Sequence, residues 1–126
     1  LPAGKVYHKP VSSMDIFATA STVAGAKMPK QVEGVNLLPY LTGKDKSRPH
    51  ETLFWRQGGK TALRHGDWKL LRMGRKFDPG KANWELYNLS KDISEESNLA
   101  ETNPERVTEL LTIWEKMNSE MSEPLF

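Results

Sequence analysis

Residues 52–89 constrain the fold most, because short strand-like runs alternate there with glycine-containing turn pairs. This stretch holds three of the four tryptophans and is divided by Gly58-Gly59 and Gly66-Asp67. A two-residue loop that begins with glycine suits a type II′ turn, which joins neighbouring antiparallel strands. A further turn at Asp78-Pro79-Gly80 lies within the expected loop 77–83. The pattern predicts an antiparallel meander with strands at Thr52–Gln57, Lys60–His65, 68–73 and 84–89.

A long amphipathic stretch follows the predicted strands. Asn103-Pro104 reads as a helix N-cap followed by proline at the first helical position. Apolar side chains then recur at steps of three and four, as on one face of a helix. These side chains are Val107, Leu110, Leu111, Trp114, Met117 and Met121. We therefore expect a helix over residues 104–121 that lays this stripe on the sheet.

A shorter helix is expected near the beginning of the chain. Ser12 or Ser13 can cap it, Asp15 in its first turn suits the helix dipole, and Gly25 stops it. Its apolar residues cover too wide an arc for one small sheet to bury. The predicted fold class is α+β: an antiparallel sheet of about four strands, covered by the C-terminal helix. The N-terminal helix packs on the sheet or on protein outside this chain.

Composition and charge exclude several classes of site. Without cysteine there is no disulfide, no thiolate nucleophile and no zinc site of the usual sulfur type. No apolar run approaches the ~18–20 residues that span a bilayer, so we expect no membrane partner. Residues 56–76 carry seven Lys or Arg against one acid, whereas residues 85–126 carry ten acids against three bases. The simplest interpretation is a basic sheet near an acidic helix. The basic strands lack a separate stacking face, so nucleic acid is not the expected partner.

Catalytic and metal-binding motifs are absent from the sequence. The three histidines lie far apart, no glycine-rich phosphate loop is present, and no serine lies in a nucleophile elbow. Asp92, Glu95 and Glu96 form an acidic loop, but without the residue order of a calcium-binding loop. We interpret these three as turn and helix-start carboxylates.

Five segments of the chain carry a family resemblance. In order they are PVSSMDIFATASTVAGA, VEGVNLLPYLTGK, LFWRQGGKTALRHGDWKLL, WELYNLSKDISEESNLA and PERVTELLTIW. Together they resemble the C-terminal end of the formylglycine-dependent, arylsulfatase-like sulfatases of the alkaline-phosphatase-like superfamily. The departures are small: Ala18 and Ile93 stand where proline is frequent in that family.

The resemblance implies a parent enzyme that hydrolyses sulfate esters with a calcium ion and a formylglycine made from cysteine or serine. Its nucleophile motif, calcium-binding aspartates and catalytic Lys and His lie upstream and match no position here. We thus expect no catalytic or metal-binding residue in this chain. Residues 1–50 are expected to be linker and N-terminal helices, a remnant of the larger catalytic domain. Residues 51–126 are expected to form the C-terminal sulfatase subdomain.

The same resemblance suggests which residues contact substrate and which partners to expect. Arg56 and Gln57, beside the flexible Gly58-Gly59, are candidates for touching a sulfated sugar or aryl group, and His65 is a third. Exposed strand-end residues would look the same. The expected partners are the upstream catalytic domain, a sulfated small molecule or sugar, and a second copy of the chain. Such enzymes are periplasmic, secreted or lysosomal.

Two other functions remain open at this stage. The chain would look the same as the C-terminal subdomain of a related phosphoryl or phosphonate ester hydrolase. It could also be an independent binding module that uses its basic face. A Cys-x-Pro-x-Arg motif upstream would decide for a sulfatase.

Overall fold

The computed structural model describes residues 1, 3–74 and 84–122, and the chain divides into two compact units. The first unit is Leu1–His50 and the second is Glu51–Phe126. The predicted loop 77–83, with its Asp78-Pro79-Gly80 turn, lies outside the described residues. That the first unit belongs to a larger catalytic domain stays a prediction.

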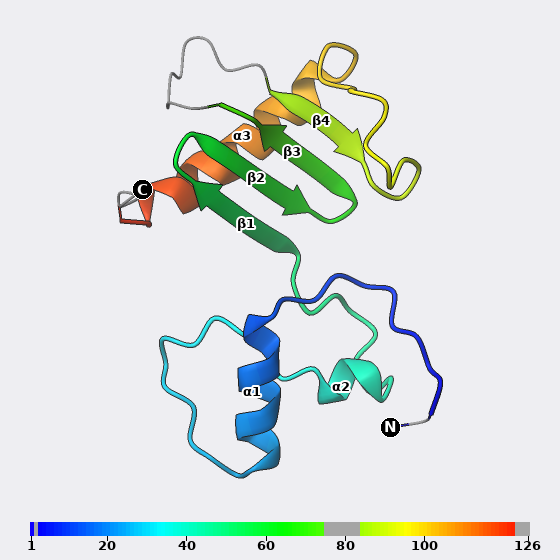
Figure 1. The fold of residues 1–126 in the computed structure, drawn as a ribbon, viewed down its shortest axis with the longest axis vertical. Helices are drawn as coiled ribbons and strands as arrows, with labels where there is room; N and C mark the ends of the chain where they lie inside the picture. Colours follow the sequence, from blue (N-terminus) through cyan, green and yellow to red (C-terminus); the bar gives the residue numbers. More distant parts are fainter. Residues whose placement is uncertain (2, 75–83, 123–126) are drawn as a thin grey trace. The chain divides into compact units, whose positions relative to one another are not determined.

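The second unit is built on a four-stranded antiparallel meander (Figure 1). Its strands are β1 (Thr52–Gln57), β2 (Lys60–His65), β3 (Trp68–Arg72) and β4 (Glu85–Asn88), and they lie side by side in chain order. Gly66 has a φ of 60°, as the first central residue of a type II′ turn requires. The predicted fold class is confirmed, with β3 ending one residue earlier than expected and β4 one residue shorter at each end.

One row of side chains crosses all four strands and forms the centre of the core. Phe54 pairs with Leu63, Leu63 with Leu70, and Leu70 with Leu86, so these four residues share one face of the sheet. The three leucines have no solvent exposure. Burying one such side chain contributes about 1.5–3 kcal/mol.

Helix α3 (Pro104–Ser119) covers this face of the sheet (Figure 1). Leu110 and Trp114 from its apolar stripe complete the buried cluster with the three leucines. The helix ends at Ser119, two residues before the predicted end. Its start differs in detail: proline is at the first turn as expected, but the Asn103 side chain makes no capping bond. The Asn103 amide instead donates to the Leu99 carbonyl at 3.2 Å.

Trp114 joins the helix to the sheet through both apolar and polar contacts. Its ring lies 6.3 Å from the Phe54 ring and 5.4 Å from the Trp84 ring, the latter edge-on. Its indole Nε1 donates to Thr61 Oγ1 at 2.7 Å, and that hydroxyl donates to the Trp55 carbonyl at 2.9 Å. A buried indole N–H needs such a partner, and here the β1–β2 strand pair supplies it.

The first unit contains two helices, α1 (Met14–Val23) and α2 (Leu38–Leu41). Gly25, with a φ of 68°, follows α1 as predicted. Of the two expected cap residues, Ser13 makes no side-chain capping bond, whereas Ser12 Oγ accepts a hydrogen bond from the Met14 N–H at 3.3 Å. Four apolar side chains of α1 are 47 to 69% exposed: Met14, Ile16, Phe17 and Val23.

We predict that Trp114→Ala destabilises the second unit by about 3–5 kcal/mol, because Trp114 is only 4% exposed and fills the space between helix and sheet. Denaturant titration measures this change. Trp55→Ala is the matched control: Trp55 is 49% exposed, so its loss should cost less than about 1 kcal/mol. Equal effects of the two substitutions would mean that α3 is not docked through Trp114.

The exposed side of α1 leads to a second prediction. Contiguous exposed apolar patches larger than a few hundred Å² are rare on stable monomers. We expect the isolated chain either to self-associate through residues 13–24 or to exchange its amide hydrogens rapidly there. Sedimentation at several concentrations and hydrogen exchange measure both. Phe17→Ser should weaken the association, whereas Ile93→Ser, which alters an exposed residue of the second unit, should not. A clean monomer with strong protection over residues 13–24 would contradict this.

Candidate functional site

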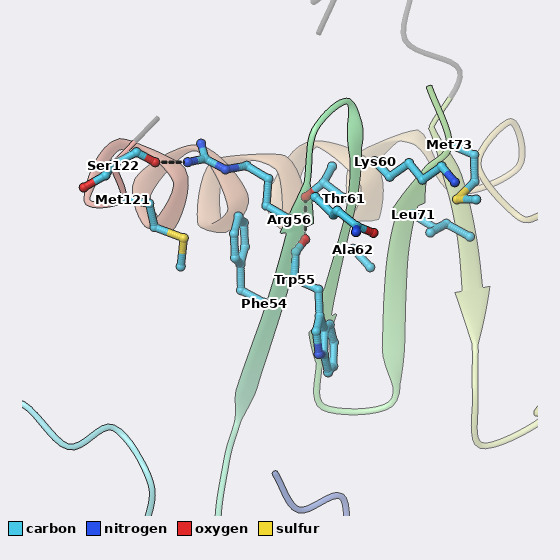
Figure 2. A pocket seen from close by; sticks show the side chains of 11 residues that line it. Phe54, Trp55, Arg56, Lys60, Thr61, Ala62, Leu71, Met73, Met121 and Ser122 are labelled. Carbon is cyan, nitrogen blue, oxygen red and sulfur yellow. Dashed lines mark hydrogen bonds between the residues drawn. The ribbon is translucent and has the colours of Figure 1, made fainter. Parts of the chain in front are cut away.

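A cleft of about 890 Å³ lies at the end of the sheet where β1 turns into β2 (Figure 2). One part lies on the sheet face away from α3, and is lined by Trp55, Gln57, Lys60, Ala62, Leu71 and Met73. The other part reaches Met121 and Ser122, which follow the C-terminal end of α3. Most of its lining surface is apolar, and a few polar side chains contribute to it, as in many small-molecule sites.

Two of the three substrate-contact candidates line this cleft. Arg56 and Gln57 are the last residues of β1, and their side chains point to opposite faces of the sheet. The Arg56 guanidinium donates to the Ser122 carbonyl (Figure 2). It also donates to Asn118 Oδ1, so it ties β1 to the end of α3. Gln57 is exposed, and no hydrogen bond to another described residue holds its side chain.

His65 lies at the opposite end of the same strand pair. It pairs with Thr52, whereas Gln57 pairs with Lys60, five residues further along β1. At about 3.3 Å per residue the two positions are roughly 17 Å apart. His65 Nδ1 lies 2.8 Å from Thr52 Oγ1, a contact within the strand pair. The structure therefore brings Arg56 and Gln57 to one cleft and leaves His65 outside it.

The acidic loop after β4 is held by its own polar side chains. Asp92 accepts hydrogen bonds from the backbone N–H groups of Glu96 and Ser97 at 3.2 and 2.9 Å. These bonds lower the pKa of the Asp92 carboxyl. Glu95 pairs with Lys69 on β3 at 2.6 Å. The structure thus shows turn carboxylates, one of which also fastens the loop to the sheet.

Asp15 was predicted only as a helix-start carboxylate, and its burial and long-range contacts in the first unit were not predicted. Asp15 has no solvent exposure and accepts hydrogen bonds from the backbone N–H groups of Ser12 and Val35 at 2.7 and 2.9 Å. His50 Nε2 lies 2.8 Å from Asp15 Oδ1. Asp15 therefore fastens the start of α1 to two segments 20 and 35 residues away. The available signal was the presence of Asp15 within the segment PVSSMDIFATASTVAGA that carries the family resemblance.

Electrostatics at Asp15 follow from these contacts. Burial raises the pKa of the Asp15 carboxyl, but the bonds from Ser12, Val35 and His50 outweigh burial and hold the pKa below its ordinary value. The site is closed: both carboxylate oxygens are already occupied by donors. We interpret it as a structural junction.

Over the described ranges, no three His, Asp or Glu side chains come together in a way that could hold a metal ion. The same part of the chain contains no helix that is both long and apolar enough to cross a bilayer.

The amino-acid sequence is similar to those of several known proteins. No protein-family model matches the chain. Steryl-sulfatase of Homo sapiens is 26% identical over 149 aligned positions, which cover 92% of this chain and 25% of the human protein. Arylsulfatase H of Canis lupus familiaris is 43% identical over 56 residues, which cover 43% of this chain and 10% of the dog protein.

A solved structure matches the whole chain. The crystal structure of Ps i-CgsB superposes with a TM-score of 0.78 at 27% identity, over 100% of this chain and 28% of that protein. The chain is a relative of the sulfatases. It matches a C-terminal subdomain of these enzymes and spans about a quarter of their length or less. Ps i-CgsB has also been solved in complex with k-i-k-neocarrahexaose.

The Asp15 junction of this sulfatase relative gives a pH prediction. Because the pKa of Asp15 is lowered on folding, its contribution to stability is present above the unfolded pKa of about 3.9 and is lost as the pH falls through the lower, folded value. The protection factors of the amides in residues 1–50, which are exchange rates corrected for the intrinsic pH dependence of amide exchange, should therefore fall below about pH 4 when followed from pH 6 to pH 3.

Substitution of Asp15 distinguishes the effect of protonating this carboxyl from general unfolding of the chain in acid. Asp15→Asn should destabilise the first unit by about 1–3 kcal/mol at neutral pH, because it leaves buried donors without their charged acceptor. It should also flatten the acid dependence. Glu33→Gln, at an exposed residue of the same unit, is the control and should change neither. An unchanged pH profile in Asp15→Asn would contradict the assignment.

Proposed function

We propose that the whole protein is a sulfatase that hydrolyses sulfate esters, and that this chain is its C-terminal, cleft-supporting part. The observation that carries the proposal is the match of the entire chain, both units included, to one solved structure at a TM-score of 0.78. The proposed reaction, sulfate-ester hydrolysis, is inferred from relatives named as sulfatases, since steryl-sulfatase aligns with 92% of the chain.

Sulfate-ester hydrolysis requires parts that the described residues do not supply. It needs an activated oxygen nucleophile, positive charge facing the sulfate oxygens and an acid for the leaving group. The described carboxylates do not gather into a calcium site, so these residues do not fit the ion. We assign calcium and formylglycine to the remaining part of the enzyme, and no catalytic step is placed in this chain.

The part played by this chain is to shape and support one side of the substrate cleft. Arg56 and Gln57 line the cleft at the end of the sheet and are the proposed contact residues. Arg56 also holds the cleft wall, because it bonds to the end of α3. His65 lies away from this cleft and could contact substrate only through a separate surface.

The substrate class follows from the relatives. The complex of Ps i-CgsB with k-i-k-neocarrahexaose supports a sulfated sugar, and the steryl- and arylsulfatase relatives support a sulfated small molecule. The family resemblance supports a periplasmic, secreted or lysosomal location for the whole enzyme.

This division of labour predicts that the 126-residue chain does not hydrolyse an aryl sulfate above a buffer blank, with or without calcium. The longer protein, carrying a Cys- or Ser-x-Pro-x-Arg motif upstream, should hydrolyse it, and replacing that Cys or Ser by Ala should abolish turnover. Turnover that co-purifies with the 126-residue chain would contradict the assignment. A longer protein that cleaves only phosphate or phosphonate esters would favour the related hydrolase instead.

A further inference from the structure

The sheet face away from α3 carries a short apolar trough next to the proposed contact residues. Trp55, Ala62 and Leu71 occupy directly opposed positions on β1, β2 and β3. Neighbouring strands are about 4.8 Å apart, so Trp55 and Leu71 stand roughly 10 Å apart with only the Ala62 methyl group between them. Met73 continues the Leu71 side of this trough (Figure 2).

Trp55 differs from the other three tryptophans in its surroundings. Trp68, Trp84 and Trp114 belong to the core between sheet and helix. Trp55 lies on the opposite face, is 49% exposed, and contacts no other aromatic ring among the described residues. A half-exposed tryptophan beside a small floor residue offers a flat surface on which a ring can stack.

Unpaired positive charge lies at one end of the trough. Lys60 is diagonal to Trp55 across the β1–β2 pair, is exposed, and forms no ion pair or hydrogen bond with another described residue. Among the described lining residues of the cleft, the two charged side chains, Arg56 and Lys60, are both cationic. Two nearby acids have contacts elsewhere. Glu85 accepts a hydrogen bond from the Tyr87 hydroxyl at 2.6 Å, and Glu95 is paired with Lys69. The trough therefore favours an anionic ligand.

We propose that this trough binds a flat ring that stacks on Trp55 and carries a sulfate group toward Lys60. The shared chemistry is an apolar ring face with one anionic substituent, which both a sulfated pyranose and an aryl sulfate provide. Stacking of the ring on Trp55 provides contact area, and the Lys60 ammonium group provides selectivity for the sulfated ligand over its uncharged counterpart. The proposal rests on the proposed sulfatase function, and it adds a non-catalytic ring-binding subsite made by Trp55 and Lys60.

The test is direct binding to the 126-residue chain, with no turnover required. The chain is titrated with sulfated neocarrahexaose, with the same oligosaccharide after desulfation, with phenyl sulfate and with phenol. The Trp55 indole N–H resonance reports on the trough. We expect saturable binding of at least one sulfated ligand, and about tenfold weaker binding of its unsulfated counterpart. The stronger of the two sulfated ligands identifies the ring class.

Matched variants assign the contacts. Trp55→Ala should weaken binding by about tenfold or more, as loss of an aromatic anchor does, and Trp55→Phe should restore part of it. Lys60→Gln should weaken binding of the sulfated ligand and reduce its salt dependence. Lys116→Gln, at an exposed lysine of α3, is the control and should do neither. Thermal unfolding of each variant verifies that the fold is retained.

Three results would overturn the proposal: no saturable binding, binding unchanged in Trp55→Ala, or a Trp55 surface buried in a dimer that the ligand does not displace. Failure here is separable from failure of the proposed function. If the longer protein hydrolyses sulfate esters but sulfated ligands do not bind at the trough, the proposed function is supported and the proposed subsite is wrong.

Discussion

The second unit depends on one cross-strand row, Phe54–Leu63–Leu70–Leu86, and on the helix that covers it. A four-stranded sheet with bare faces is marginal in water, and packing against a helix is what makes it stable. Trp114 connects the two layers, since its ring packs toward Phe54 and its indole N–H bonds to Thr61. The sheet register matters for the same reason: a slip of one residue would turn the whole row to the other face.

Several residues of the segment WELYNLSKDISEESNLA, which carries part of the resemblance to sulfatases, stabilise the local structure after β4. Asn98 Oδ1 accepts hydrogen bonds from the backbone N–H groups of Leu86 and Ala100, both at 3.0 Å, so it closes the outer edge of β4. Leu99 N–H adds a bond to the Leu86 carbonyl at 2.8 Å. Glu95 reaches Lys69 from a left-handed conformation with a φ of 58°, which costs free energy for a non-glycine residue. The family pattern in this loop therefore encodes the covering of a sheet edge, where unpaired backbone groups would otherwise invite association.

The sequence predicted the elements whose signals are local and periodic. The two glycine turns and the alternation within residues 52–73 predicted the meander, and the three-and-four spacing predicted α3 and its buried face. Contacts between distant segments were not predictable in this way. Arg56 bonds to Asn118, 62 positions away, and Asp15 meets His50 across 35 positions. No local pattern specifies such pairs. Arg56 was singled out for its place beside a turn, whereas its bonds depend on where α3 ends.

The two faces of the sheet separate stability from recognition. Trp114 on the closed face is surrounded by the core, and its polar atom is satisfied within the fold. Trp55 on the open face has only the small Ala62 directly opposite it on β2, so its ring contributes little to the core. Because the stability of this sheet comes from the face that α3 covers, the residues on the other face can be substituted with little loss of stability. A strand that alternates Phe54 and Trp55 can therefore hold the subdomain together with one aromatic residue and present the next to a ligand.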